Sequence, residues 1–360
     1  MAKVVGQLLV ITVFLGPVRA VAQPGPPGPD MTVDAAMRAT VVEGAAKSLS
    51  DYYVFPDVAD RMAAAIRRHQ QRHDYDSITS ARMLAERLTA DLRDISHDRH
   101  LMVVYSATVL PVPPPPNAVP SAEELERARN VMAQINFGFE KVERLAGNIG
   151  YLDLRAFAPP QFMGDTAAAA MNFLSSADAV IIDLRQNGGG SPDAVALIAS
   201  YLMGPLPARM NDIYNRETNQ THQFWTLPYV PGKRLTGKDV YVLTSQRTFS
   251  AAEDFTYGLK NLKRVTVVGE VTGGGAHPGG PRRINDHFAV AVPSGRSISI
   301  FTNTDWEGTG IEPDIKVPAD RALATAHLMA LEKRAPGVTN PRMKSEIEDA
   351  IARLKKELGS

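Results

Sequence analysis

Apolar residues recur at helical spacing through the first hundred residues of the chain. They return every three or four positions in three successive stretches, which predicts three amphipathic helices packed as a small bundle. The residues of these stripes are Met37, Val41, Ala45 and Leu49, then Val58, Met62 and Ile66, then Leu84, Leu88, Leu92 and Ile95. A strand-like run follows at 101–105, so we predict an N-terminal helical domain over residues 32–109.

Short apolar runs alternate with helical patterns in the longer second part of the chain. A proline-rich segment at 110–120 precedes it and is predicted to be an extended linker. The pattern predicts strands at 137–142, 148–154, 179–184, 240–243 and 265–268, and helices at 121–134, 166–174, 192–203 and from residue 250. This alternation predicts an α/β core over residues 121–336, followed by a C-terminal helix at 337–360.

The segment 238–275 changes from a strand pattern to a helix pattern at Ser250. Ala251, Phe255 and Leu259 then fall on one helical face. Backbone N–H groups are unpaired at a helix start, so a serine oxygen there can attack a carbonyl while nearby amides hold the oxyanion. Ser250 and Glu253 also match a capping box, in which the serine only ends the helix. This segment alone leaves both interpretations open.

Two other turns are rich in glycine. Gly189 and Gly190 lie between a predicted strand and the helix that begins at Ser191-Pro192. Glycine permits close backbone approach there. A phosphate-binding loop is the alternative, yet neither GxGxxG nor GxxxxGK[ST] occurs. The second glycine-rich stretch, at 273–280, is expected to be flexible and contains His277.

The N-terminus has the pattern of a secretory signal. Lys3 precedes an apolar stretch at 4–18, and Ala20-Val21-Ala22 forms a small-x-small cleavage site. We therefore predict a signal peptide at 1–22, a flexible lead-in at 23–31, and export to the periplasm or the extracellular space. A retained membrane anchor is the alternative, and no later segment is apolar enough to span a membrane. The chain has no cysteine, which excludes disulfides and thiol catalysis.

Charge and histidine spacing restrict the possible partners. The 39 basic and 39 acidic residues balance, so nothing favours nucleic acid or an anionic membrane surface. His97 and His100 lie three apart beside acidic residues, which is one possible metal motif. The spacing is not HExxH and no other ligand cluster accompanies it, so we expect no metal and no other cofactor. Taken alone, His97 reads as a solvated residue at a helix end.

Four motifs occur in a characteristic order. They are DLRQNGGG at 183–190, TFSAAE at 248–253, GEVTG at 269–273 and EGTGIEPD at 307–314. Together they resemble the tail-specific, or C-terminal-processing, serine peptidase family, which includes the tricorn core protease and the interphotoreceptor retinoid-binding protein. The resemblance covers about residues 32–320, and the segment 214–228 is similar to an insertion of the retinoid-binding branch. It implies a spiral α/β core like that of crotonase and ClpP. A PDZ domain is expected to be absent, because 101–147 is too short to hold one.

The resemblance also implies roles for individual residues. It makes Ser250 the nucleophile. Family members with a serine–lysine dyad place the lysine where this chain has Gly275, and 273–280 contains no lysine. The implied set is therefore the tricorn-like one, with His97 as the base, Ser96 orienting it, and Glu307 completing the hydrogen-bond network.

The oxyanion hole is implied to consist of the backbone amides of Ala251 and Gly190, with Gly189 in the same turn. His277 is the rival base, because its glycine-rich loop is near the position of the family's lysine. The implied activity is an exported serine endopeptidase or carboxy-terminal-processing peptidase that acts on peptides or unfolded protein. The alternative is a non-enzymatic carrier of retinoid-like or fatty-acid ligands.

Overall fold

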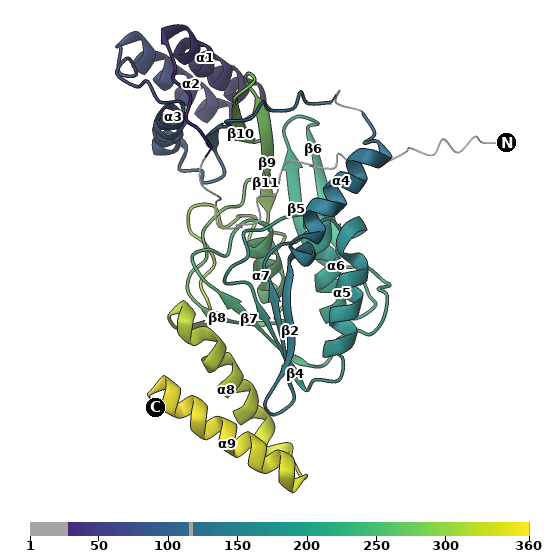
Figure 1. The fold of residues 1–360 in the computed structure, drawn as a ribbon. Coiled ribbons are helices and arrows are strands. Elements are labelled where there is room, and N and C mark those ends of the chain that lie inside the picture. The colour runs from purple at the N-terminus through teal and green to yellow at the C-terminus, as the bar shows by residue number, and fades with distance from the viewer. Residues whose placement is uncertain (1–27, 115–117, 360) are drawn as a thin grey trace, which may run out of the picture.

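The computed structural model describes residues 28–114 and 118–359 (Figure 1). The predicted signal peptide and most of the predicted lead-in lie outside these residues. In the part of the chain that is described, no helix combines the length and apolar character needed to cross a membrane.

Three helices form the N-terminal domain, as the apolar periodicity predicts. They are α1 (Ala35–Tyr52), α2 (Pro56–Gln71) and α3 (Ala81–Ser96). Asp34 caps α1 by accepting the Met37 N–H at 2.7 Å, and Ser80 caps α3 by accepting the Met83 N–H at 3.0 Å. The apolar stripes of the three helices are buried against one another.

A two-stranded arm from the second half of the chain completes this domain. Strand β1 (Met102–Tyr105) pairs antiparallel with β10 (Phe288–Pro293), which pairs with β9 (Gly279–Arg283). Phe288, Val290 and Val292 alternate along β10 and point into the helical core. Figure 1 shows β9 and β10 reaching up to the helices. The end of the glycine-rich stretch expected to be flexible is therefore a strand, because β10 pairs with it.

The α/β core is built on a six-stranded sheet. Its order is β12-β8-β7-β4-β3-β2, parallel from β12 to β3, with β2 antiparallel to β3. The strands are β2 (Phe139–Leu145), β3 (Ile149–Leu154), β4 (Ala179–Asp183), β7 (Asp239–Thr244), β8 (Thr266–Gly269) and β12 (Ile315–Lys316). The five strands predicted from apolar runs are all present, with shifted ends.

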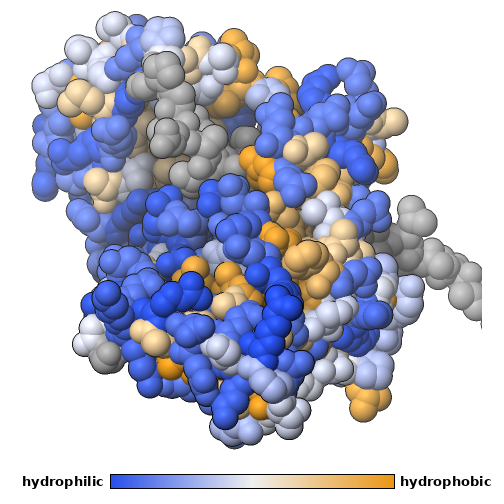
Figure 2. All heavy atoms as spheres, turned by 60° about the horizontal axis from the view of Figure 1, so that its bottom comes forward, coloured by the Kyte–Doolittle hydropathy of each residue, from blue (hydrophilic) through white to orange (hydrophobic). Residues whose placement is uncertain are grey.

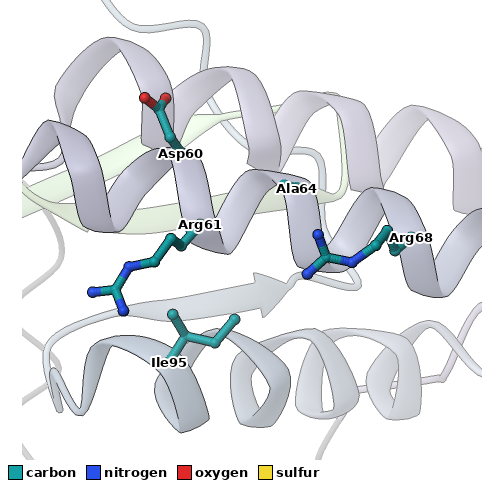
Figure 3. Close-up of a pocket in the computed structure, with 5 residues that line it drawn as sticks. All are labelled: Asp60, Arg61, Ala64, Arg68 and Ile95. Carbon is teal, nitrogen blue, oxygen red and sulfur yellow. The ribbon is translucent and has the colours of Figure 1, made fainter.

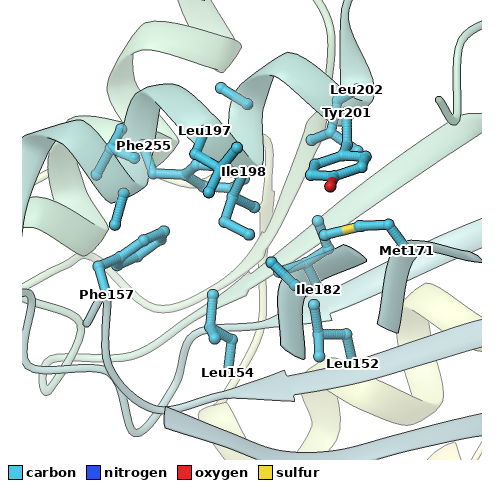
Figure 4. Close-up of a cluster of buried hydrophobic side chains, with 14 of the residues drawn as sticks. Leu152, Leu154, Phe157, Met171, Ile182, Leu197, Ile198, Tyr201, Leu202 and Phe255 are labelled. Atoms are coloured by element: carbon cyan, nitrogen blue, oxygen red, sulfur yellow. The ribbon is translucent and has the colours of Figure 1, made fainter. Parts of the chain in front are cut away.

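Helices cover both faces of this sheet. One face packs on α5 (Pro160–Leu174), α6 (Pro192–Leu202) and α7 (Ala251–Asn261), and its buried side chains appear in Figure 4. The other face packs on α8 (Ala322–Arg334) and α9 (Pro341–Leu358). Val180 and Ile182 point to the first face and Ile181 to the second, which is why β4 is apolar from Ala179 to Ile182.

The remaining elements lie around this core. Helix α4 (Ala122–Ala133), which was predicted at 121–134, begins in a capping box made by Ser121 and Glu124. A three-stranded sheet, in the order β11-β5-β6, was not predicted. Its strands are β5 (Arg209–Asn215), β6 (Gln220–Trp225) and β11 (Gly295–Ile298), and short 3₁₀ turns occupy Asn136–Gly138, Ala319–Arg321 and Ala335–Gly337. Strand β6 is largely exposed and polar, so it lacks the apolar run that marks a core strand.

The sheet brings two predicted motifs together. Strands β4 and β7 are parallel neighbours in register, with Asp183 opposite Leu243. Both strands end at the same edge and lead into helices, β4 through residues 184–191 and β7 through residues 245–250. Loops at the carboxyl ends of parallel strands are the usual place for a site in such a fold. The glycine turn and the Ser250 turn therefore lie side by side.

Candidate active site

The turn that carries Ser250 is tied to the neighbouring loop. The Phe249 N–H donates to the Asn187 carbonyl at 3.0 Å, and the Thr248 hydroxyl donates to the Leu184 carbonyl at 2.8 Å. Ser250 itself is partly buried and adopts φ 57° and ψ −121°, a conformation that non-glycine residues rarely occupy. The surrounding hydrogen bonds hold this strained backbone at the start of α7.

Glu253 connects the Ser250 turn to the second glycine-rich loop. Its buried carboxylate accepts the N–H groups of Ser250 and Gly275 at 2.8 Å and that of Gly274 at 2.7 Å, and it also accepts the Thr272 hydroxyl. Burial raises the pKa of Glu253, while these hydrogen bonds act in the opposite direction. The capping interaction thus occurs in the same turn as the predicted nucleophile position.

The glycine turn fits against Ser250 because it lacks side chains. A Cβ on Gly189, where φ is +108°, would lie 2.8 Å from the Ser250 Cβ. A Cβ on Gly190, where φ is +143°, would lie 2.1 Å from the Phe157 carbonyl oxygen. Both positions therefore require glycine.

The predicted oxyanion donors differ in availability. Across the described residues, the N–H groups of Ala251 and Gly190 donate to no protein acceptor. The Gly189 N–H is already engaged, because it donates to the Asn187 side chain at 2.8 Å. The structure thus leaves two of the three predicted amides free beside Ser250.

The predicted Ser96–His97 pair lies at the end of α3. His97 is exposed and ends the helix in the left-handed conformation, at φ 55°. The Ser96 hydroxyl donates to the Leu92 carbonyl at 3.0 Å and accepts the Asp98 N–H at 3.2 Å, so it stabilises its own turn. In the described chain, no hydrogen bond, ion pair or ring contact joins either side chain to the Ser250 turn. The structure therefore does not bring this pair to the nucleophile.

His100, three residues later, does lie against the nucleophile turn. Its ring packs on Phe249 with 4.5 Å between ring centroids, and its Cε1 would be 2.7 Å from a Cβ on Gly275. Both ring nitrogens are buried and have no hydrogen-bond partner among the residues that the structure describes. Burial lowers the pKa of His100 to about 4, so the ring is neutral at pH 7. Sequence reasoning noted His100 only as one half of a possible metal pair.

His277 is committed to neighbouring carboxylates. Its Nδ1 lies 2.8 Å from Asp98 Oδ2 and 3.5 Å from Glu307 Oε2, and its Nε2 lies 3.8 Å from Asp305 Oδ2. Burial acts to lower the pKa of His277, but the contacts with Asp305 and Asp98 outweigh it and raise the pKa to about 10. The ring is therefore an imidazolium at pH 7. In this protonated form it has no nitrogen free to accept a proton, so it cannot act as a base.

Glu307 is hydrogen-bonded to the second glycine-rich loop. Its Oε2 accepts the Ala276 N–H at 2.5 Å, while its Oε1 is buried without a partner. Burial raises the pKa of Glu307, and the Asp98 charge raises it further. The structure brings Glu307 together with His277 and Asp98, and no described contact joins it directly to Ser250.

Asp98, His277 and Glu307 offer three possible metal-ligand atoms within 4.8 Å of one another. Ligands at about 2.1 Å around a tetrahedral zinc ion lie roughly 3.4 Å apart. The 2.8 Å between His277 Nδ1 and Asp98 Oδ2 is instead a hydrogen-bond distance. A proton shared within an ion pair explains this cluster better than a metal does.

Comparisons with known proteins identify the family. A model described as peptidase family S41 matches residues 148–317, and a model described as the N-terminal domain of this peptidase in eukaryotic IRBP matches residues 31–139. Among solved structures, a putative peptidase from Parabacteroides merdae is 20% identical, with a TM-score of 0.54 over 78% of this chain and 90% of that one.

Two further structures share the fold at lower identity. Mature CPAF is 12% identical, with a TM-score of 0.56 over 82% of this chain and 98% of that one. A lipoprotein from Streptococcus agalactiae is 13% identical, with a TM-score of 0.54 over 82% of this chain and 96% of that one.

The helical domain and the α/β core each match a model of one peptidase family, which makes the chain a serine peptidase. The chain belongs to peptidase family S41. The resemblance read from the ordered motifs is thereby confirmed, and so is the predicted arrangement of a helical domain before an α/β core. The absence of a PDZ domain and the domain boundaries stay predictions.

Proposed function

We propose that this protein is an exported peptidase that hydrolyses peptides or unfolded protein tails with Ser250 as the nucleophile. One observation carries the proposal: Ser250 caps α7 beside two amides that donate to no acceptor among the described residues, and the adjacent Phe249 packs on the neutral His100 ring, whose nitrogens also lack a partner there. These are the three elements that acyl transfer needs, namely a nucleophile, a proton acceptor and oxyanion donors.

The contacts support a role for each of these residues. Ser250 Oγ attacks the scissile carbonyl, and His100 takes its proton and returns it to the leaving amine. The amides of Ala251 and Gly190 hold the developing oxyanion. The ring contact with Phe249 and the two free nitrogens support His100 as the base over His97, whose side chain is exposed.

Export is supported by the N-terminal pattern and by the likeness to a lipoprotein. Peptide substrates are the class that the family acts on. The face of the molecule in Figure 2 is largely hydrophilic, in keeping with the balance of acidic and basic residues. The balance of 39 basic and 39 acidic residues gives no support for a nucleic-acid partner.

Two open pockets on the described surface give no support to the carrier alternative. One, of about 470 Å³, lies between α2 and α3 and is lined by Asp60, Arg61, Ala64, Arg68 and Ile95 (Figure 3). The other, of about 720 Å³, lies near the start of α9, with Arg144, Arg334 and Glu346 among its lining residues. Sites for apolar ligands are lined mainly by hydrophobic side chains, unlike these.

Incubation of the mature protein with a peptide library, followed by mass spectrometry, tests the proposal. Wild-type protein should cleave a subset of peptides, and Ser250→Ala should lower turnover by roughly ten-thousandfold while the fold survives. Ser191→Ala is a matched control, because Ser191 occupies the corresponding strand-to-helix turn before α6. It should retain most activity. A Ser250→Ala protein as active as wild type rules the proposal out.

A further inference from the structure

A buried carboxylate joins the helical domain to the proposed active site. Asp98 lies in the turn between α3 and β1 and is fully buried. Its Oδ1 accepts the His100 N–H at 3.0 Å. Its Oδ2 accepts the Tyr53 hydroxyl at 3.2 Å and lies 2.8 Å from His277 Nδ1. One side chain thus contacts the end of α1, the turn that carries His100, and the loop from the α/β core.

The groups around Asp98 are held from both domains. The His277 ring packs edge-on against Phe55 of the helical domain, with 5.3 Å between centroids. The carbonyl of Tyr53 accepts a hydrogen bond from Arg216, at the end of β5 in the core. The Arg99 guanidinium donates to the Gly273 carbonyl, at the start of the glycine-rich loop. Asp98 is therefore the centre of a bonded network that crosses the domain boundary.

The charges of the neighbouring side chains explain why Asp98 and His277 need to pair with each other. Asp98, Asp305 and Glu307 are three carboxylates gathered around one imidazolium. A buried carboxylate without a cationic or hydrogen-bonding partner is strongly unfavourable. The pairing of Asp98 with His277 therefore fixes the distance between the α3–β1 turn and the glycine-rich loop.

We propose that Asp98 is a positioning residue for the peptidase reaction, holding His100 against the Ser250 turn by pairing with His277 across the domain interface. This inference rests on the proposed function. His100 makes no hydrogen bond through its own ring nitrogens, so its orientation depends on its backbone and on ring packing. A shift of about 1 Å in a catalytic group lowers the rate by roughly a hundredfold.

Steady-state kinetics on a cleaved peptide tests the proposal. Asp98→Asn keeps the size of the side chain and removes its charge, and should lower kcat by about 10–100-fold with KM within about threefold. Tyr53→Phe, which removes one hydrogen bond and preserves packing, should lower kcat by about 3–10-fold. Asp94→Asn is the matched control, since Asp94 is an exposed aspartate in the last turn of α3, four residues before Asp98. It should behave like wild type.

A double mutant separates positioning from a general loss of stability. If Asp98 acts through His100, Asp98→Asn should cost little further activity in a His100→Ala background. Penalties that multiply would overturn the proposal. Hydrogen exchange gives a readout that needs no activity. The amides at 97–105 and 273–277 should exchange faster in Asp98→Asn and at the wild-type rate in Asp94→Asn.

The outcomes distinguish this inference from the function on which it rests. If wild type and Asp94→Asn cleave no peptide, the proposed function fails, whatever the exchange rates show. If both cleave peptides while Asp98→Asn keeps its kcat and its exchange pattern, only the positioning role is refuted. Loss of wild-type activity on chelation, with recovery on adding Zn²⁺, would also refute it by making the cluster a metal site.

Discussion

The proposed base predicts a pH dependence that separates three histidines. Replacing His100 by alanine should lower kcat/KM by about 10³–10⁴-fold, nearly as much as Ser250→Ala, because the serine then has no proton acceptor. His97→Ala should change kcat/KM by less than about threefold, because its ring is exposed and has no described contact with the nucleophile turn. His277→Gln should cost about tenfold through the position of the loop.

The size of the expected pH effect follows from the pKa values of His100 and His277. With the pKa of His100 lowered to about 4, roughly 99.9% of the rings are neutral at pH 7 and able to accept a proton. With the pKa of His277 raised to about 10, about one ring in a thousand is neutral at that pH. A His100 base therefore predicts activity that stays level from pH 8 to pH 6 and falls towards pH 4. A His277 base predicts activity that rises tenfold per pH unit towards pH 10.

The assay is kcat/KM on a fluorogenic version of a cleaved peptide between pH 4 and pH 10. Circular dichroism at each pH confirms that the protein remains folded over the range that is fitted. A profile that rises steadily from pH 7 to pH 10, with His100→Ala as active as wild type, would refute the reasoning. If the fall in activity at low pH disappears in His97→Ala, then His97 is the base, as the family resemblance implies.

Three other predictions concern the scaffold of the site. Gly189→Ala should lower kcat/KM by at least about a hundredfold, because the new Cβ meets Ser250 at 2.8 Å, whereas Gly188→Ala, with nothing within 4 Å, should be close to wild type in the same assay. Glu253→Gln should lower the free energy of unfolding by about 1–3 kcal/mol in urea titrations, because an amide group cannot accept hydrogen bonds from all four donors. Unchanged stability would contradict the conclusion that this carboxylate holds the two loops together. The pKa of His277 is raised in the folded state, so the contribution of its charge to stability is full below about pH 6.5 and is lost as the pH rises towards 10. In thermal melts, His277→Gln should therefore lose less stability than wild type over this range. An identical loss in both proteins would contradict the raised pKa.

Much of the fold was predictable because its core strands carry strong local signals. The apolar runs of β4 and β7 are buried on both faces of a parallel sheet, and the start of α7 has the pattern of a helix cap. The arm of β9 and β10 was missed because a glycine- and proline-rich run introduces it. Its apolar residues find their partners in helices more than 180 positions earlier in the chain, which no local pattern records.

The candidate site was also only partly predictable from local sequence. Ser250 follows from local sequence, because a strand-to-helix turn places its oxygen at a helix start. The choice between His97 and His100 does not, since both lie in one turn. The left-handed backbone at His97 and the burial of Asp98 leave the first ring in solvent and place the second on Phe249. Likewise, the partner that fixes His277 lies 179 residues away.

The most direct test of the central claim is covalent labelling of the nucleophile. The mature protein is treated at pH 7 with a peptidyl phosphonate, which reacts with activated serines, and the modified peptide is identified by mass spectrometry. The account predicts a single adduct on Ser250, lost in Ser250→Ala and formed at least about a hundredfold more slowly in His100→Ala. An adduct on another serine, or labelling that is unaffected by His100→Ala, would contradict it.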